Sequence, residues 1–202
     1  MSLISLRRSY TLIAPLYDAV LAGAGAGLRA ASLAQLPQEG SLRILISGIG
    51  TGLDLPHLPA CHQYAGLDLT AAMLDRARSR GGNLQLELVR GDSMSLPFPD
   101  KSFDYVVLHL ILAIVPDAHA CLRESARVLK PGGKILVLDK FLRQGEPAGF
   151  RRMLNRITQH LVTRLDVIFE DVLDGAQGLR LEEDVPILAG GWFRRIRLIK
   201  TG

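Results

Sequence analysis

Three glycines alternate at positions 48, 50 and 52, directly after a short apolar segment. Glycine has no β-carbon, so this pattern suits a tight turn whose backbone can approach a ligand closely. Asp68 lies twenty residues after Gly48, at the end of the next apolar segment. A carboxylate in that place typically accepts hydrogen bonds from both hydroxyls of a ribose. Together, the two features predict a site for a ligand that contains a nucleoside.

The spacing of the glycines excludes two common nucleotide sites. A dinucleotide site requires G-x-G-x-x-G, but Leu53 stands where its third glycine belongs. The sequence Gly132-Gly133-Lys134 is followed by Ile135 instead of Ser or Thr, so it does not form a P-loop. The common ligand that remains is S-adenosylmethionine (SAM), which has a ribose and an adenine but no phosphate. Taken alone, the glycine pattern also suits a turn that serves only packing.

A second acidic position follows the third apolar segment, in the sequence Gly91-Asp92-Ser93-Met94. Asp92 is placed to accept a hydrogen bond from an adenine amino group, while Ser93 and Met94 offer backbone groups and an apolar surface to the ring. Gly-Asp also suits an ordinary turn. The ordered set of glycines, acid and Gly-Asp after three successive strands is what favours a SAM site.

These residues need a sheet whose strands end at one edge. Apolar segments typical of strands alternate with helical segments, which predicts a doubly wound α/β sheet, and the glycines lie where the first strand turns into a helix. The predicted strands are 42–46, 63–67, 84–88, 103–108 and 134–138, with helices at 70–80 and 117–130 and a C-terminal antiparallel hairpin at 180–188 and 192–200. We expect a single domain, 1–202, with an N-terminal helical cap at 1–40 on a Rossmann-like core at 41–202.

The composition is that of an ordinary globular chain. Of the 202 residues, 48% are hydrophobic and 22% charged, which excludes a disordered protein. Two cysteines without C-x-x-C spacing exclude a disulfide framework and favour a reducing compartment. The longest apolar run, Tyr105 to Val115, is about half of the roughly 20 residues that a membrane-spanning helix needs. We therefore expect a cytoplasmic protein.

Several longer motifs resemble the class I SAM-dependent methyltransferases. They are Ile44–Gly52 (ILISGIGTG), Gly66–Thr70 (GLDLT) with Met73-Leu74, Leu96–Asp104 (LPFPDKSFD) and Arg127–Gly133 (RVLKPGG). The sequence looks most like the branch that holds the ubiquinone/menaquinone C-methyltransferases and the bacterial phosphatidylethanolamine N-methyltransferases. Both groups share the segment Tyr10–Asp18 (YTLIAPLYD). The GIGTGL loop followed by Leu55-Pro56, Val115-Pro116-Asp117 and the ending Gly191–Arg197 look more like the phospholipid group.

The resemblance implies a Rossmann-like sheet of seven strands, SAM as the cofactor and S-adenosylhomocysteine as its product. The family often carries an acid two residues before the first glycine, which helps to hold the methionine amino group, but here that residue is Ile46. Backbone carbonyls near Gly48 and Leu108 would then take this role. The implied cofactor contacts are Gly48, Gly50, Thr51, Gly52, Asp68, Leu69, Met73, Asp92, Ser93, Met94, Leu108 and His109.

Methyl transfer from a sulfonium requires alignment and exclusion of water more than acid–base chemistry. The candidate catalytic residues are Tyr10, Tyr17 and His109. The tyrosines lie on the N-terminal helix that covers the cofactor in relatives, although their spacing also suits core packing. His109 follows the fourth strand, where it could accept a proton, orient the acceptor or simply pack. Asp139 and Lys140 follow the fifth strand, near the mouth of the site or in solvent.

The favoured acceptor is the amine head group of phosphatidylethanolamine. The alternatives are C- or O-methylation of a quinone precursor or another small molecule, and a non-catalytic SAM-binding partner or sensor. The stripe of apolar residues in Phe150–Ile168, flanked by arginines, suits either packing on the sheet or peripheral contact with the inner membrane surface. His57, Cys61 and His62 lack a fourth ligand, so we expect no metal. The Asn/Asp-Pro-Pro-aromatic motif of nucleic-acid amine methyltransferases is absent, so we expect no nucleic-acid partner.

Overall fold

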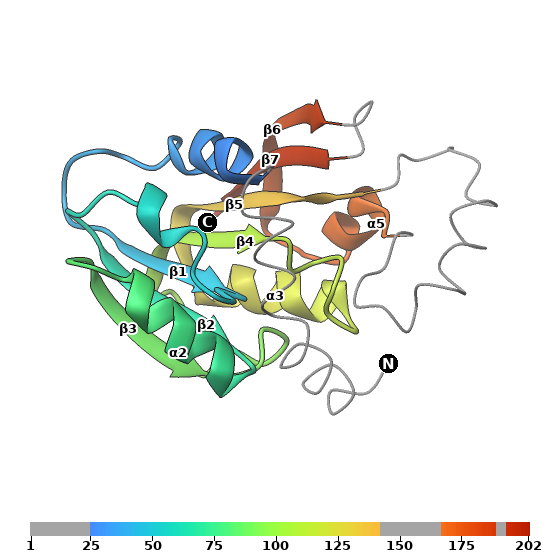
Figure 1. Cartoon of the computed structure of the whole chain (residues 1–202). Helices are drawn as coiled ribbons and strands as arrows, with labels where there is room; N and C mark the ends of the chain where they lie inside the picture. The colour runs from blue at the N-terminus through green and yellow to red at the C-terminus, as the bar shows by residue number, and fades with distance from the viewer. Residues whose placement is uncertain (1–24, 142–166, 189–192) are drawn as a thin grey trace.

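The computed structural model describes residues 25–141, 167–188 and 193–202. They form a seven-stranded sheet in the order β3-β2-β1-β4-β5-β7-β6, with helices on both faces (Figure 1). β1 to β5 run parallel, and β7 runs antiparallel to both of its neighbours. This confirms the predicted doubly wound sheet and its C-terminal antiparallel pair. The strands are β1 (Arg43–Ser47), β2 (Gln63–Asp68), β3 (Gln85–Arg90), β4 (Phe103–His109), β5 (Leu129–Lys140), β6 (Leu179–Leu188) and β7 (Phe193–Lys200).

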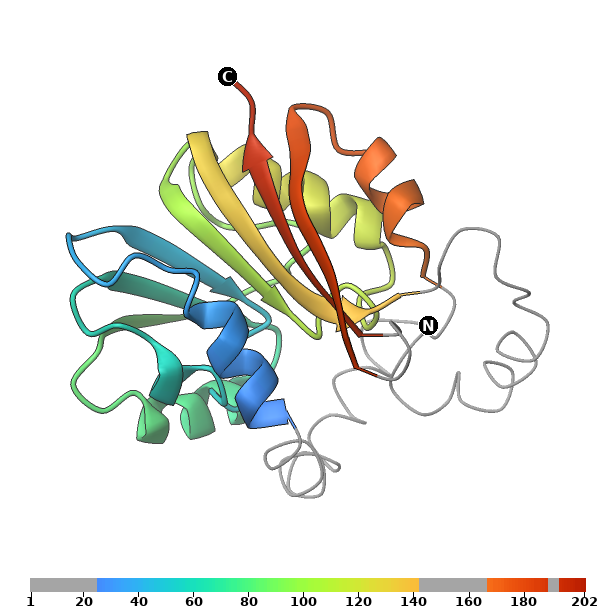
Figure 2. The same ribbon diagram turned by 90° about the horizontal axis from the view of Figure 1, so that it is seen from above.

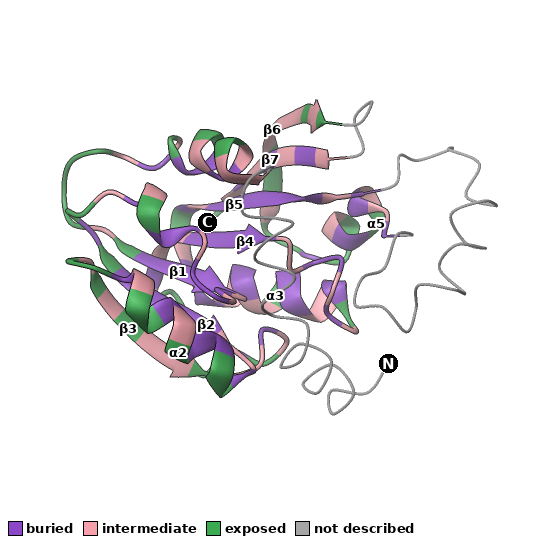
Figure 3. Cartoon of the chain, viewed as in Figure 1, coloured by how far each residue is buried: buried purple, intermediate pink, exposed green. Residues whose placement is uncertain are grey.

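The central strands are apolar throughout because helices cover the sheet on both faces. Successive side chains of a strand point to opposite faces, and the two hydrophobic clusters follow this alternation. Ile44 and Ile46 of β1 belong to one cluster, while Leu45 between them belongs to the other. Figure 3 shows the buried residues concentrated along β1, β4 and β5. The core is therefore divided in two by the sheet.

Different parts of the chain cover the two faces (Figure 2). One cluster contains residues of the helix at 25–33, of the 3-10 helix η1 (Leu55–His57) and of α2 (Ala71–Arg80). The other contains residues of α3 (Ala118–Val128) and α5 (Phe169–Asp174). The N-terminal helix at 25–33 thus packs on the same face as the elements that follow the glycines.

Two local predictions differ from the structure. Where a helix was expected after the glycine loop, the structure has only the three-residue η1. Pro59 lacks the amide hydrogen that a continuing helix needs, and Leu58 before it is extended. The helix expected over 117–130 ends at Val128, and Pro131-Gly132-Gly133 lies inside β5 instead of closing the helix. Leu129 pairs with Phe103 before the register shifts, so these three residues form an irregularity in the strand.

Tyr10, Tyr17 and most of the amphipathic segment Phe150–Ile168 lie outside the described residues, as do residues 189–192 between the two strands of the expected hairpin. The helix expected at 70–80 is α2, which begins at Ala71. Thr70 precedes it, and its side chain makes no capping hydrogen bond.

Gly52 has little tolerance for a side chain. Its φ is +83°, and a β-carbon there would lie 2.9 Å from Cα of Ala77 and 2.8 Å from Leu55. We expect Gly52→Ala to lower the free energy of unfolding by about 2–5 kcal/mol, because it combines a left-handed backbone with overpacking. Urea unfolding measures this value.

Gly27→Ala is the matched control, because Gly27 is exposed in a helix and a β-carbon there meets nothing within 4 Å. This variant should be neutral or slightly more stable. Equal unfolding midpoints for Gly52→Ala and the wild type would contradict the packing described for the glycine loop.

Candidate functional site

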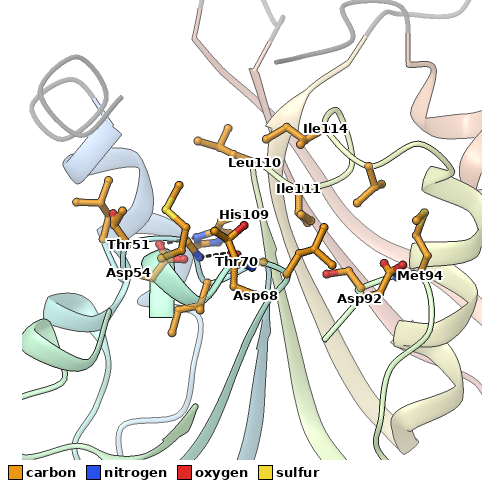
Figure 4. Close-up of a pocket in the computed structure, with 18 of the residues that line it drawn as sticks. Thr51, Asp54, Asp68, Thr70, Asp92, Met94, His109, Leu110, Ile111 and Ile114 are labelled. Atoms are coloured by element: carbon orange, nitrogen blue, oxygen red, sulfur yellow. Dashed lines mark hydrogen bonds and ion pairs between the residues drawn. The ribbon is translucent and has the colours of Figure 1, made fainter. Parts of the chain in front are cut away.

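A cavity opens at the carboxyl edge of the sheet, where β1 and β4 lie side by side and the chain order reverses. Such a reversal is the usual ligand site of an open α/β sheet. Figure 4 shows residues from the glycine loop, from the ends of β2 and β4 and from the loop after β3 directed into it. The lining is Arg29, Gly48–Thr51, Leu53, Asp54, Asp68–Thr70, Met73, Asp92–Met94, His109–Ile111 and Ile114–Pro116.

The glycine loop wraps the end of β1 and leaves room above its centre. Gly48 and Gly50 have φ values of +76° and +55°. A β-carbon on Gly48 would lie 2.6 Å from Ile111, whereas one on Gly50 would meet nothing within 4 Å. The backbone amides of Gly48 and Ile49 both donate to the carbonyl of Leu67, which fixes the loop against β2. The loop is therefore packed at Gly48 and open at Gly50.

Asp68 is held by the backbone on two sides. Its Oδ2 accepts from the amide of Gly50 at 3.0 Å and its Oδ1 from the amide of Thr70 at 2.8 Å. Burial raises the pKa of Asp68, and the hydrogen bonds from backbone amides offset this only in part. Each carboxylate oxygen can accept more than one hydrogen bond, so Asp68 keeps the capacity to bind two vicinal hydroxyls.

The Gly91–Met94 segment forms a tight turn at the other side of the cavity. Asp92 Oδ1 accepts from the amide of Met94 at 2.8 Å, which orients the carboxyl group. Ser47 donates from its hydroxyl to Ser93 Oγ at 2.9 Å, so the turn is tied to the end of β1. Met94 packs partly against the core. The turn presents one acid and one apolar side chain to the cavity.

A buried polar network that the sequence did not indicate occupies the wall near the helix at 25–33. Arg29 Nη1 donates to Asp54 Oδ1 at 2.9 Å, and His109 Nδ1 lies 2.9 Å from the same oxygen. The other ring nitrogen of His109 lies 2.9 Å from Ser32 Oγ. Burial alone would raise the pKa of Asp54, but His109 and Arg29 outweigh it and hold this pKa well below its usual range. Asp54 is therefore a carboxylate.

This network resembles the Ser-His-Asp arrangement of nucleophilic enzymes, yet Ser32 is fully buried and does not line the cavity. Nδ1 of His109 lies within hydrogen-bond distance of Asp54, and Nε2 lies within hydrogen-bond distance of the hydroxyl of Ser32. Both ring nitrogens thus have partners within the protein. The contacts of His109 thus join Ser32 in the helix at 25–33 to Asp54 before η1 and to the end of β4, and they position these segments relative to one another.

Most of the residues predicted for the cofactor line this one cavity: Gly48, Gly50, Thr51, Asp68, Leu69, Met73, Asp92, Ser93, Met94 and His109. Gly52 and Leu108 lie behind it, since Gly52 faces Ala77 and Leu108 is fully buried in the core. Sequence reasoning missed Arg29 and Asp54. Their separation of 25 residues follows no local pattern, and a lone arginine on a helix usually faces solvent.

Asp139 lies inside β5, fully buried, instead of near the mouth of the site. Its Oδ2 accepts from the amide of Ala113 at 3.1 Å and its Oδ1 from the amide of Lys140 at 2.8 Å. The bond to Ala113 fixes the loop at 110–116, which carries the apolar side of the cavity. Burial raises the pKa of Asp139 from 3.8 to about 6, despite these hydrogen bonds.

Because this pKa is higher in the folded chain than in the unfolded chain, the folded state binds the proton more tightly. The contribution of Asp139 to stability is therefore greatest below pH 4 and falls as the pH rises to about 6. The shift of about two units corresponds to about 3 kcal/mol. We expect Asp139→Asn to remove this decline from the free energy of unfolding measured across pH 4 to 7. An unchanged slope would contradict the shifted pKa.

Among the described residues, no helix has the length and apolar character to cross a membrane. The same residues contain no group of three side chains placed to bind a metal ion.

The family described as "Methyltransferase domain" matches residues 45–137. The phosphatidylethanolamine N-methyltransferase of Cereibacter sphaeroides is 32% identical over 202 residues, which cover 98% of each chain. The demethylmenaquinone methyltransferase of Bacillus licheniformis is 43% identical over 92 residues, which cover 45% of this chain and 39% of that protein.

Solved structures share the fold at low identity. A methyltransferase of Haloferax volcanii, in complex with the activator Trm112, has a TM-score of 0.78 at 19% identity and covers 96% of this chain and 98% of that chain. The [4+2]-cyclase SpnF has a TM-score of 0.76 at 19% identity, over 96% and 94% of the two chains. These likenesses concern the fold alone, whereas the Cereibacter relative matches in sequence along almost its whole length. The chain therefore belongs to the SAM-dependent methyltransferases, in the branch of the phosphatidylethanolamine and demethylmenaquinone methyltransferases.

Proposed function

We propose that this enzyme transfers a methyl group from SAM to the amine head group of phosphatidylethanolamine. The observation that carries the proposal is the extent of the likeness to the Cereibacter enzyme, which spans 98% of both chains. That span includes the segments outside the cofactor core, where contacts with an acceptor are expected. The likeness to the Bacillus enzyme covers less than half of this chain.

The residues of the cavity fit SAM. Asp68 has free acceptor capacity for the ribose hydroxyls, and the open space above Gly50 lets a ligand approach the backbone. Asp92 suits the adenine amino group. Among the described residues that line the cavity are three acids, Asp54, Asp68 and Asp92, and one arginine, Arg29. This excess of negative charge suits a ligand that carries a sulfonium.

SAM supplies a methyl group that is already activated, so the protein has to align the acceptor and exclude water. Leu110, Ile111 and Ile114 line one side of the cavity and are only partly buried (Figure 4). An apolar side of this kind suits the hydrocarbon part of a lipid next to its head group. It also desolvates an amine, which favours the neutral form that can accept a methyl group. Because this acceptor lies in a bilayer, we place the enzyme peripherally at the inner membrane surface.

Methylation of a quinone precursor is the second candidate. It is favoured by the 43% identity with the Bacillus enzyme over the matched 92 residues. A quinone precursor with an isoprenoid tail would also suit the apolar side of the cavity. The two candidates differ in the atom methylated, nitrogen or carbon, so the product separates them.

Binding of SAM is the first test of this proposal. We expect Asp68→Ala to raise the Kd for SAM at least about 100-fold in calorimetry, because two hydrogen bonds to a charged group are lost. Asp75→Ala is the control, since Asp75 is exposed on α2 and does not line the cavity. Equal Kd values for Asp68→Ala and the wild type would contradict the assigned cofactor site.

The acceptor is tested with SAM labelled in its methyl group and vesicles that contain either phosphatidylethanolamine or demethylmenaquinone. We expect label in N-methylated phosphatidylethanolamine, identified by mass spectrometry, and none after Asp68→Ala. Label only in the quinone would overturn the lipid proposal and support the second candidate. Tight SAM binding without transfer to either acceptor would favour a partner or sensor protein that binds SAM without catalysis.

A further inference from the structure

The ion pair between Arg29 and Asp54 is buried in the wall of the cavity, with side-chain exposures of 9% and 4%. Both residues line the cavity, and Arg29 is the only lysine or arginine among its described lining residues. Burying two charges costs several kcal/mol in desolvation, and their attraction often fails to offset it. Stabilisation alone is therefore a poor explanation for this pair. Because both residues line the cavity, a role in binding a ligand is the better explanation.

The pair has unused hydrogen-bonding capacity on both sides. The bonds from Arg29 and from His109 both fall on Oδ1 of Asp54. Oδ2 accepts no hydrogen bond from the part of the chain that the structure describes. Arg29 uses only Nη1 there, although a guanidinium carries five N–H donors. The cavity wall thus offers one carboxylate oxygen beside several guanidinium N–H groups.

The position of the pair matches one end of the cofactor. In Figure 4, Asp68 lies between Asp54 on one side and Asp92 with Met94 on the other. With the ribose at Asp68 and the adenine at Asp92, the amino-acid end of SAM is directed toward Asp54. Ile46, at the end of β1 below the glycine loop, is buried in the sheet and has no polar side-chain atom that could hold this end.

We propose that Arg29 and Asp54 form the subsite for the zwitterionic amino-acid end of SAM. Asp54 Oδ2 accepts from the α-ammonium group, and the free N–H groups of Arg29 donate to the α-carboxylate. A carboxylate oxygen beside guanidinium N–H groups is complementary to a ligand group that carries one positive and one negative charge. The subsite rests on SAM being the cofactor of the cavity.

The test compares two ligands by calorimetry: S-adenosylhomocysteine, which has the amino-acid end, and 5′-methylthioadenosine, which lacks it. We expect the wild type to bind the first at least about 10-fold more tightly, as hydrogen bonds to charged groups allow. In Asp54→Asn this ratio should fall below about 3-fold, with the Kd for 5′-methylthioadenosine unchanged. Asp104→Asn is the matched control, since its carboxylate bonds to Arg43 and Lys130 outside the cavity and the ratio should stay at the wild-type value.

Several outcomes would overturn the subsite. One is that the wild type binds both ligands with equal affinity. Another is that a folded Asp54→Asn variant loses the same factor of affinity for both ligands, which would make Asp54 a structural residue only. Circular dichroism and the Tm establish folding. If Asp54→Asn does not fold, the wild type is titrated with S-adenosylhomocysteine analogues that lack the carboxylate or the amine. An undiminished affinity for both analogues overturns the proposal. Failure of the wild type to bind SAM, S-adenosylhomocysteine and 5′-methylthioadenosine would instead reject the cofactor itself, and the subsite with it.

Discussion

The pairing of β1 with β2 on one side and β4 on the other is the constraint on which the site depends. Ser47 is level with Leu67, and Ile46 is level with Val107. Since the strands run parallel in this register, the glycine loop, Asp68 and His109 all leave the sheet at one edge. A slip of one residue would turn every side chain of β1 to the opposite face, so the two apolar clusters that fix the register also fix the geometry of the cavity.

Three carboxyl groups near this edge show how the surroundings shift the pKa of the same chemical group in opposite directions. Asp68 and Asp139 are held by backbone amides, which do not fully offset the effect of burial, so their pKa values are raised. Asp54 is also buried, but its carboxyl group faces His109 and Arg29, which lower its pKa. Of these three acids, Asp54 is the one whose described partners are basic side chains, and these partners favour its ionised form.

The features predictable from sequence are those encoded within a few neighbouring residues. The glycines at 48, 50 and 52 and the acids at 68 and 92 follow apolar strands, so their place at the sheet edge could be inferred. The end of the helix expected over 117–130 could not be placed from the sequence. The strand β5 already begins at Leu129, because Leu129 pairs with Phe103 of β4. The Arg29–Asp54 contact forms only because the helix at 25–33 packs on the same face as η1. No periodicity or motif in either segment indicates that contact.

The network of Arg29, Asp54, His109 and Ser32 also limits how such a chain can change over evolutionary time. Replacing either Arg29 or Asp54 leaves a charge buried without its partner, which typically costs about 3–5 kcal/mol out of a total stability of about 5–15 kcal/mol. Drift at these positions is therefore expected to be concerted: homologues should retain the acid at 54 together with the base at 29, or replace both. Covariation of positions 29 and 54, which are distant in sequence, would then reflect the packing of the helix at 25–33 beside η1.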